Sequence, residues 1–164
     1  MTASVSPEKE DLKNILADRV ALVTGSGRGI GKSIATLLAM HGARVVISDM
    51  NVETSDATAD ELTKAGYKAI SAPANVTQSE SIEKMIETTM GQYGQIDILV
   101  NNAGITRDDL FMRMSEEHWQ AVIDTNLTSA FKVTKPILKI MSKQRYGRIV
   151  NIASTTGVHG NPGQ

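Results

Sequence analysis

The 164-residue sequence is long enough for one domain with a hydrophobic core, and its 41% hydrophobic and 21% charged residues are ordinary for a soluble globular protein. A formal net charge of -1 argues against binding to nucleic acid or an anionic membrane, and no apolar run approaches the length of a membrane-spanning helix. The absence of cysteine excludes disulfides and thiolate metal sites, and the three histidines lack metal-ligand spacing, so we expect no metal.

Residues 1–17 are polar and are predicted to form a flexible lead-in to the domain. They lack the apolar core of a secretory signal, and they carry several acids, unlike a transit peptide. We therefore expect a cytoplasmic protein, with the mature form of an organellar protein as the alternative.

From residue 18 onwards, short apolar runs alternate with segments of helical periodicity. Ser79 and Ser115 are predicted helix N-caps, and Pro136 is expected to interrupt or kink the last helix. Strands that alternate with helices imply a parallel sheet covered on both faces, so residues 18–164 are predicted to form one α/β domain. In chain order, the predicted elements are a strand over 19–24, a helix over 29–41, a strand over 43–48, a helix over 52–65, a strand over 67–72, a helix over 79–91, a strand over 96–100, a helical region over 115–141 and a strand over 147–153.

A glycine-rich loop joins the first predicted strand to the first predicted helix. Phosphates bind at such junctions because free N–H groups and the helix dipole point at the ligand, and glycine lets the backbone approach it closely. The alternative is a tight turn that binds nothing. The candidate cofactor-binding residues of the loop are Thr24, Gly25, Ser26, Gly27, Arg28, Gly29, Ile30 and Gly31.

Asp49 follows the second predicted strand, where an acid of a dinucleotide-binding domain takes the ribose hydroxyls. The alternative role for Asp49 is to cap the next helix. As a ribose ligand, Asp49 would repel a 2′-phosphate and so favours NAD(H). Arg28 works in the opposite direction, because a nearby cation can accept that phosphate and make NADP(H) possible.

Five segments together resemble the short-chain dehydrogenase/reductase family. The stretch TGSGRGIG over 24–31 is similar to its TGxxxGxG cofactor motif, and Asn101, Asn102, Ala103 and Gly104 match its NNAG motif. Asn75 and Val76 stand where the family often has Asp-Val beside the adenine; the change to Asn puts an amide in place of the acid. Asn126 matches the helix asparagine of the catalytic set, and Ser154 matches its catalytic serine.

This resemblance implies a Rossmann-type, doubly wound parallel sheet with strand order 3-2-1-4-5, a dinucleotide-binding domain over 18–164, and NAD or NADP as cofactor. In the family, a tyrosine gives the proton to the carbonyl oxygen, a lysine four residues later lowers its pKa, the serine positions the carbonyl, and the asparagine holds a water. No Tyr-x-x-x-Lys occurs among the 164 residues, because Tyr67, Tyr93 and Tyr146 are followed four residues later by Ser71, Asp97 and Val150.

We therefore expect a chain that is truncated before the catalytic tyrosine and lysine and before the sixth and seventh strands of the family, and that is inactive as written. The fifth strand is then expected to be an exposed hydrophobic edge.

Within the family, the stretches NAGITRDDL over 102–110, GRIVNI over 147–152 and GNPGQ over 160–164 resemble 3-oxoacyl-acyl-carrier-protein reductases. The implied function is NAD(P)H-dependent reduction of a 3-oxoacyl thioester in fatty-acid biosynthesis, on acyl-carrier protein or acyl-CoA, by a homotetramer. Arg145 matches an arginine that docks acidic carrier protein in relatives; the alternative is a solvated basic face. Two other functions stay open: a dehydrogenase for an alcohol, a sugar or acetoacetyl-CoA, and a nucleotide-binding fragment without catalysis.

Overall fold

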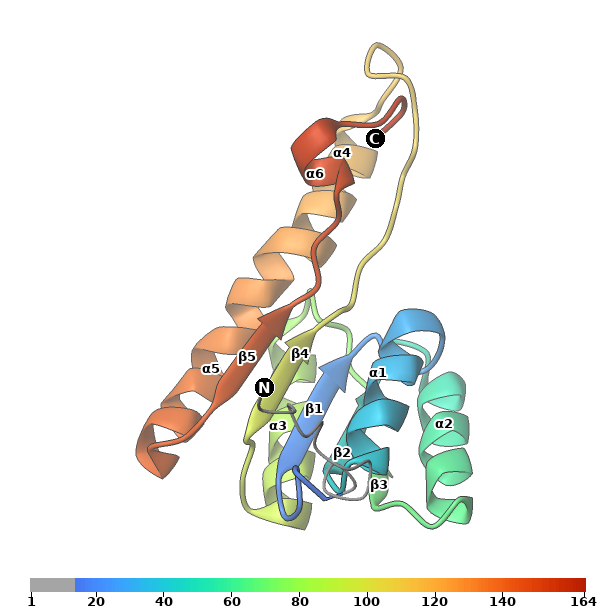
Figure 1. The fold of residues 1–164 in the computed structure, drawn as a ribbon. Helices are drawn as coiled ribbons and strands as arrows, with labels where there is room; N and C mark the ends of the chain where they lie inside the picture. The colour runs from blue at the N-terminus through green and yellow to red at the C-terminus, as the bar shows by residue number, and fades with distance from the viewer. Residues whose placement is uncertain (1–13) are drawn as a thin grey trace, which may run out of the picture.

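The computed structural model of the chain describes residues 14–164, which form one five-stranded parallel sheet (Figure 1). The order is β3-β2-β1-β4-β5, which confirms the predicted doubly wound arrangement. Each apolar run is short because a strand passes through the buried layer once and is followed by a loop. The strands are β1 (Val20–Thr24), β2 (Arg44–Ser48), β3 (Ala69–Ser71), β4 (Ile98–Asn101) and β5 (Arg148–Asn151).

Helices cover the two faces of the sheet, and each face has its own core. Leu22 lies in register with Val46 and Leu99, and this face packs against α3 (Ser79–Tyr93) and α5 (Ser129–Gln144). Val23 belongs to the opposite face, which packs against α1 (Gly29–Met40) and α2 (Val52–Lys64). Alternation of side chains along each buried strand produces this division. The helical elements are α1 (Gly29–Met40), α2 (Val52–Lys64), α3 (Ser79–Tyr93), α4 (Glu116–Ile123), η1 (Asp124–Thr128), α5 (Ser129–Gln144) and α6 (Thr156–His159).

The predicted helical region over 115–141 is interrupted, but not at Pro136. Pro136 lies inside α5, and the interruption is the π-helical turn η1. A proline removes one backbone hydrogen bond, whereas Val133, Ile137 and Met141 bury one side of α5 in the core and keep the helix continuous. The predicted interruption at Pro136 is therefore wrong.

Smaller differences concern the ends of elements. The strand predicted over 67–72 is the shorter β3, and the strand predicted over 147–153 is the shorter β5. Gln78, not Ser79, is the N-cap residue of α3, whereas Ser115 caps α4 as predicted, with its side chain accepting from the His118 N–H. Differences of this size arise because apolar content and polar caps locate an element but do not mark the residue at which its backbone pairing begins or ends.

The predicted lead-in is only partly described, since residues 1–13 lie outside the described residues. Residues 14–18 form a turn in which the Leu16 N–H donates to the His41 carbonyl at 3.0 Å. Leu16 also packs against the core between the sheet, α1 and α2. This end of the predicted lead-in is therefore attached to the domain.

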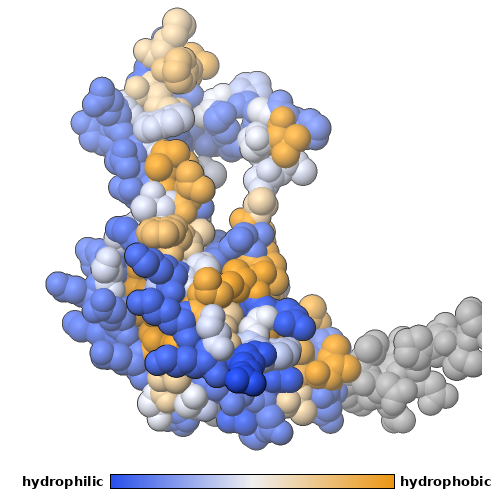
Figure 2. Space-filling model, turned by 90° about the vertical axis from the view of Figure 1, so that its left-hand side faces the viewer, coloured by the Kyte–Doolittle hydropathy of each residue, from blue (hydrophilic) through white to orange (hydrophobic). Residues whose placement is uncertain are grey.

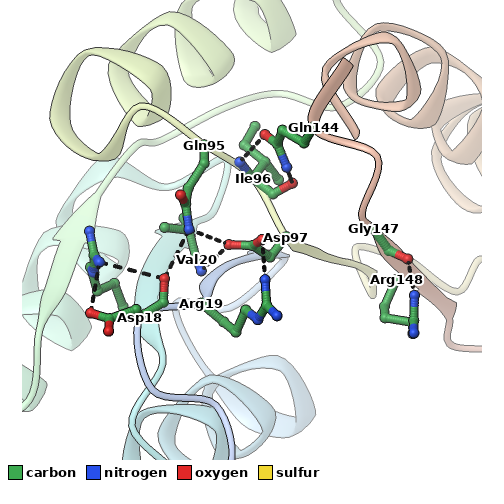
Figure 3. A network of polar contacts seen from close by, with 10 residues as sticks. Asp18, Arg19, Val20, Gln95, Ile96, Asp97, Gln144, Gly147 and Arg148 are labelled. Carbon is green, nitrogen blue, oxygen red and sulfur yellow. Dashed lines mark hydrogen bonds and ion pairs between the residues drawn. The ribbon is translucent and has the colours of Figure 1, made fainter. Parts of the chain in front are cut away.

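The amino-terminal ends of the central strands are joined by a buried carboxylate (Figure 3). Asp97 is 3% exposed and accepts from the Val20 N–H at 2.9 Å and from Arg19 Nη1 at 3.2 Å. The Gln144 side-chain amide pairs with both backbone groups of Ile96, at 3.1 and 3.0 Å. These contacts connect β1, β4 and α5 at the end of the sheet opposite the glycine loop.

β5 is an edge strand of the sheet and has exposed apolar side chains, as expected. Val150 is 46% exposed and Ile149 is 36% exposed, whereas strands β1 and β2 are almost fully buried. After β5 the chain extends away from the sheet and forms α6. It then meets the loop that follows β4, where the Asp109 N–H donates to the Gly163 carbonyl at 3.0 Å (Figure 1).

Candidate functional site

The glycine loop leaves the start of α1 open. Gly25 and Gly29 have φ values of +63° and +58°, in the left-handed region that favours glycine. A Cβ on Gly29 would meet no atom within 4 Å. Arg28, the N-cap residue of α1, forms no side-chain capping bond, and the first turn holds no acid. The N–H groups of this turn therefore face space in which an anion is favoured by the helix dipole.

Two other glycines are required by close packing. A Cβ on Gly27 would lie 2.6 Å from Thr54 Oγ1 and 2.9 Å from Asp49 Oδ2. A Cβ on Gly31 would overlap the Gly25 carbonyl oxygen and lie 2.5 Å from Asn102 Nδ2. The loop thus packs closely against Asp49 after β2, against α2 and against the segment after β4. A side chain at either glycine would collide with these neighbours.

The side chains of Thr24 and Ser26 lie beneath the loop. Ser26 is fully buried, and its Oγ donates to the Val23 carbonyl at 2.6 Å and accepts from the Ser48 N–H at 3.0 Å. Thr24 Oγ1 accepts from the Asn102 N–H at 3.0 Å. Both hydroxyls therefore support the loop through protein contacts.

Asp49 is oriented by two backbone N–H groups. Its Oδ2 accepts from Gly27 at 3.1 Å and its Oδ1 from Asn51 at 3.1 Å. The N-cap of α2 is Asn51, whose side chain accepts from the Thr54 N–H at 3.0 Å, so the alternative that Asp49 caps this helix is wrong. A half-buried carboxylate held beside the glycine loop is placed to receive hydroxyl donors.

The NNAG segment joins the loop to the centre of the sheet. Asn102 Nδ2 donates to the carbonyl oxygens of Thr24 at 2.9 Å and Gly25 at 3.0 Å. Asn101 Nδ2 donates to Thr134 Oγ1 at 3.0 Å and to Asn151 Oδ1 at 2.8 Å, which links β4 to α5 and β5. Asn101 therefore connects three elements of the fold, and Asn102 holds the glycine loop in place.

A cavity of about 620 Å³ collects most of the predicted cofactor-binding residues. Several residues that line the cavity were not predicted from the sequence. Four of them could have been found because they are close neighbours of predicted site residues: Ala74 and Thr77 flank Asn75 and Val76, and Asp124 and Thr125 precede Asn126. Met50 directly follows Asp49, and Ile105 and Arg107 lie in the 102–110 stretch, so these three also had a neighbouring signal, whereas Ala121 had none. The predicted residues that line the cavity are Gly25, Arg28, Gly29, Ile30, Gly31, Asp49, Asn75, Val76, Asn102, Ala103 and Gly104.

Asn75 is engaged by its own loop. Its Oδ1 accepts from the Thr77 N–H at 3.0 Å and from Thr77 Oγ1 at 2.8 Å, and its N–H donates to Ser81 Oγ at 2.9 Å. Val76 beside it is buried. The carboxamide therefore shapes this wall of the cavity.

The two predicted catalytic residues lie outside the lining of the cavity. Asn126 is in η1, and its carboxamide pairs with both backbone groups of Ile105, accepting from the N–H and donating to the carbonyl oxygen at 2.9 Å each. Ser154 is exposed, and its Oγ lies 2.8 Å from Thr156 Oγ1. Asn126 is thus tied to the cavity through Ile105, whereas Ser154 stands on the segment after β5.

Residues 14–164 contain no group of three or more His, Asp or Glu side chains arranged to hold a metal ion. In the same part of the chain, no helix is long and apolar enough to cross a membrane.

Comparisons with known proteins agree with this arrangement. A family model described as short chain dehydrogenase matches residues 19–164. The 3-oxoacyl-[acyl-carrier-protein] reductase of Synechocystis sp. is 50% identical over 150 residues, which are 91% of this chain and 61% of that protein. The protein of the same name from Escherichia coli is 45% identical over 146 residues, 89% of this chain and 59% of that protein. The chain therefore spans about 60% of the length of these relatives. Since the family model covers the whole sheet and the glycine loop, the chain belongs to the short-chain dehydrogenase family.

Proposed function

We propose that this chain forms the cofactor-binding part of an NAD(P)H-dependent reductase that converts a 3-oxoacyl thioester to the 3-hydroxyacyl thioester in fatty-acid biosynthesis. The observation that carries this proposal is the 620 Å³ cavity bounded by the glycine loop, Asp49 and the NNAG segment. The names of the relatives, 3-oxoacyl-[acyl-carrier-protein] reductases, support the substrate class.

The residues around the cavity fit a nicotinamide dinucleotide. The uncapped start of α1 and the empty space above Gly29 suit a pyrophosphate, which would accept from the N–H groups of this turn. Asp49 would bind ribose hydroxyls, and Asn75 and Val76 would border the adenine. When bound, the reduced nicotinamide supplies the hydride for carbonyl reduction.

NAD(H) is the proposed cofactor in preference to NADP(H). The two N–H groups on Asp49 hold its carboxylate in place, so a ribose 2′-phosphate would meet a negative charge that does not move aside. Arg28 lines the same cavity and reduces this discrimination.

Calorimetric titration with NADH and NADPH tests both points. We expect NADH to bind more tightly by about tenfold, which is about 1.4 kcal/mol. Asp49→Ala should weaken NADH binding and reduce the preference, whereas Asp56→Ala, an exposed acid on α2, should change neither. If neither dinucleotide binds, the proposed site is wrong. A tenfold preference for NADPH would overturn the role of Asp49.

For the chemistry, we propose that the Ser154 hydroxyl donates to the substrate carbonyl oxygen and that Asn126 holds the cavity wall at Ile105. The 164 residues contain no Tyr-x-x-x-Lys, so they lack the family's proton donor. We therefore expect this chain to bind NADH without reducing acetoacetyl-CoA. NADH oxidation by the purified chain would contradict this expectation.

The substrate and subunit contacts are proposed from two surfaces. Arg145 is exposed at the end of α5 and would dock acidic acyl-carrier protein, so Arg145→Glu should weaken carrier binding. Exposed apolar residues gather along α4, η1 and α5 (Figure 2) and would pack against further copies in a homotetramer. They are Trp119, Leu127, Phe131 and Leu138. Sedimentation of the wild type and of Phe131→Glu tests this contact; equal masses would contradict it.

A further inference from the structure

A lysine on α5 reaches a wall of the cavity from outside. Lys132 Nζ donates to the Thr77 carbonyl oxygen at 2.7 Å, and the two residues are 55 positions apart in the sequence. Lys132 is half-buried and does not line the cavity, whereas Thr77 does. Hydrogen bonds that involve an ammonium group are stronger than those between neutral groups. The contact is therefore a firm attachment of the cavity wall to the helix behind it.

The wall itself is a short loop over residues 74–77, between β3 and α3, and we call it the 74–77 wall. At its start, the Ala74 N–H donates to the Asp49 carbonyl at 3.0 Å. In its middle, Asn75 and Thr77 bond to each other. Within residues 14–164, Lys132 is the α5 side chain that hydrogen-bonds to this wall. Without it, the Thr77 end would keep only contacts within its own loop and to α3.

The same helical unit also holds a second part of the cavity. Asn126, in the π-turn that leads directly into α5, pairs with both backbone groups of Ile105, a lining residue after β4. Lys132 in the following turns holds Thr77. The η1–α5 unit therefore sets the positions of two lining segments that come from different loops.

We propose that Lys132 is a positioning residue that holds the 74–77 wall in place for the adenine half of the dinucleotide. This inference rests on the proposed cofactor site, and it adds a residue that no motif or cavity contact indicates. A helical lysine whose stem merely covers apolar surface would not need its ammonium group at a carbonyl oxygen. The two roles differ in what happens when the ammonium group alone is removed.

Hydrogen exchange on the ligand-free chain tests the anchor by itself. Lys132→Met keeps the apolar stem and removes the donor. We expect the Thr77 and Gln78 amides, which bond to Asn75, to exchange at least about threefold faster, while β1 and β4 amides are unchanged. Lys132→Arg should restore slow exchange. Lys135→Met, an exposed lysine one turn away, is the matched control. Unchanged exchange at Thr77, or an increase throughout the sheet, overturns the proposal.

Binding measurements test the consequence. ADP-ribose contains the adenine half of the cofactor without the nicotinamide. Lys132→Met should weaken both ADP-ribose and NADH by about tenfold, and Lys132→Arg should remain within about threefold of the wild type. Weakened NADH with unchanged ADP-ribose overturns the assignment to the adenine half. If the wild type binds neither ligand, the proposed cofactor site fails, and hydrogen exchange alone decides whether Lys132 anchors the wall.

Discussion

Replacing Gly31 by alanine should damage the glycine loop more than its position in a helix suggests. A Cβ at Gly31 would overlap the Gly25 carbonyl oxygen and lie 2.9 Å from the Gly25 carbonyl carbon and 2.5 Å from Asn102 Nδ2. Two of these atoms are backbone, so they cannot turn away as the end of a long side chain would. Relief requires the loop and α1 to separate, which also strains the bonds from Asn102 to the loop.

The magnitude follows from these contacts. Overpacking costs about 1–3 kcal/mol. The two hydrogen bonds from Asn102 contribute about 1 kcal/mol each when lost. Alanine recovers about 1 kcal/mol through its higher helix propensity. We therefore expect Gly31→Ala to lower the free energy of unfolding by about 2–4 kcal/mol and to abolish NADH binding.

Gly91→Ala is the matched control, because Gly91 lies at an exposed position in α3, where an added Cβ would meet no atom within 4 Å. It should be neutral or stabilise the chain by up to about 1 kcal/mol. Urea unfolding followed by far-ultraviolet circular dichroism measures both variants. A Gly31→Ala chain as stable as Gly91→Ala, with NADH affinity intact, would refute the packing argument.

Three further predictions concern residues away from the cavity. Asp97→Ala should lower the free energy of unfolding by about 2–4 kcal/mol, since Arg19 and a buried N–H lose their acceptor; a urea midpoint equal to that of the wild type would contradict this. Burial raises the pKa of Tyr93, so its contribution to stability is complete below pH about 10 and is lost as the pH rises through the raised pKa. Tyr93→Phe should reduce this alkaline loss of stability, and an unchanged pH profile would speak against it. Ser115→Ala should cost about 1 kcal/mol by uncapping α4. A hydrogen bond from Ser115 holds the pKa of Glu117 below its ordinary value, so an NMR titration of this variant should show that pKa rising.

Much of the candidate site was predictable because its signals are local. The glycines between Thr24 and Gly31 mark backbone conformations that favour glycine or close approaches that leave no room for a Cβ, so their spacing points to the loop directly. Asp49 follows from its place at the end of the second strand. Even there, the sequence left two roles for Asp49, and the cap on α2 turned out to be Asn51.

The π-turn at 124–128 is different, because nothing in its sequence marks it. Pro136 is the strongest local signal for a break in this region, yet α5 continues through it because its apolar side is packed against the sheet. Tertiary packing outweighed the local cost of a proline.

The alternating pattern of apolar strands and helices was enough to predict the parallel sheet, and the glycine spacing was enough to predict a candidate nucleotide site at the end of β1, since these features depend on neighbours in the chain. Only the tertiary structure could decide that Asn102, directly after the adjacent strand β4, holds the loop, that Asn101 joins β4 to β5, and that Lys132 reaches Thr77. These contacts join residues 50 to 78 positions apart. Such pairs meet only because hydrophobic burial has already fixed which helix lies on which face, and no local pattern of residues encodes that distance.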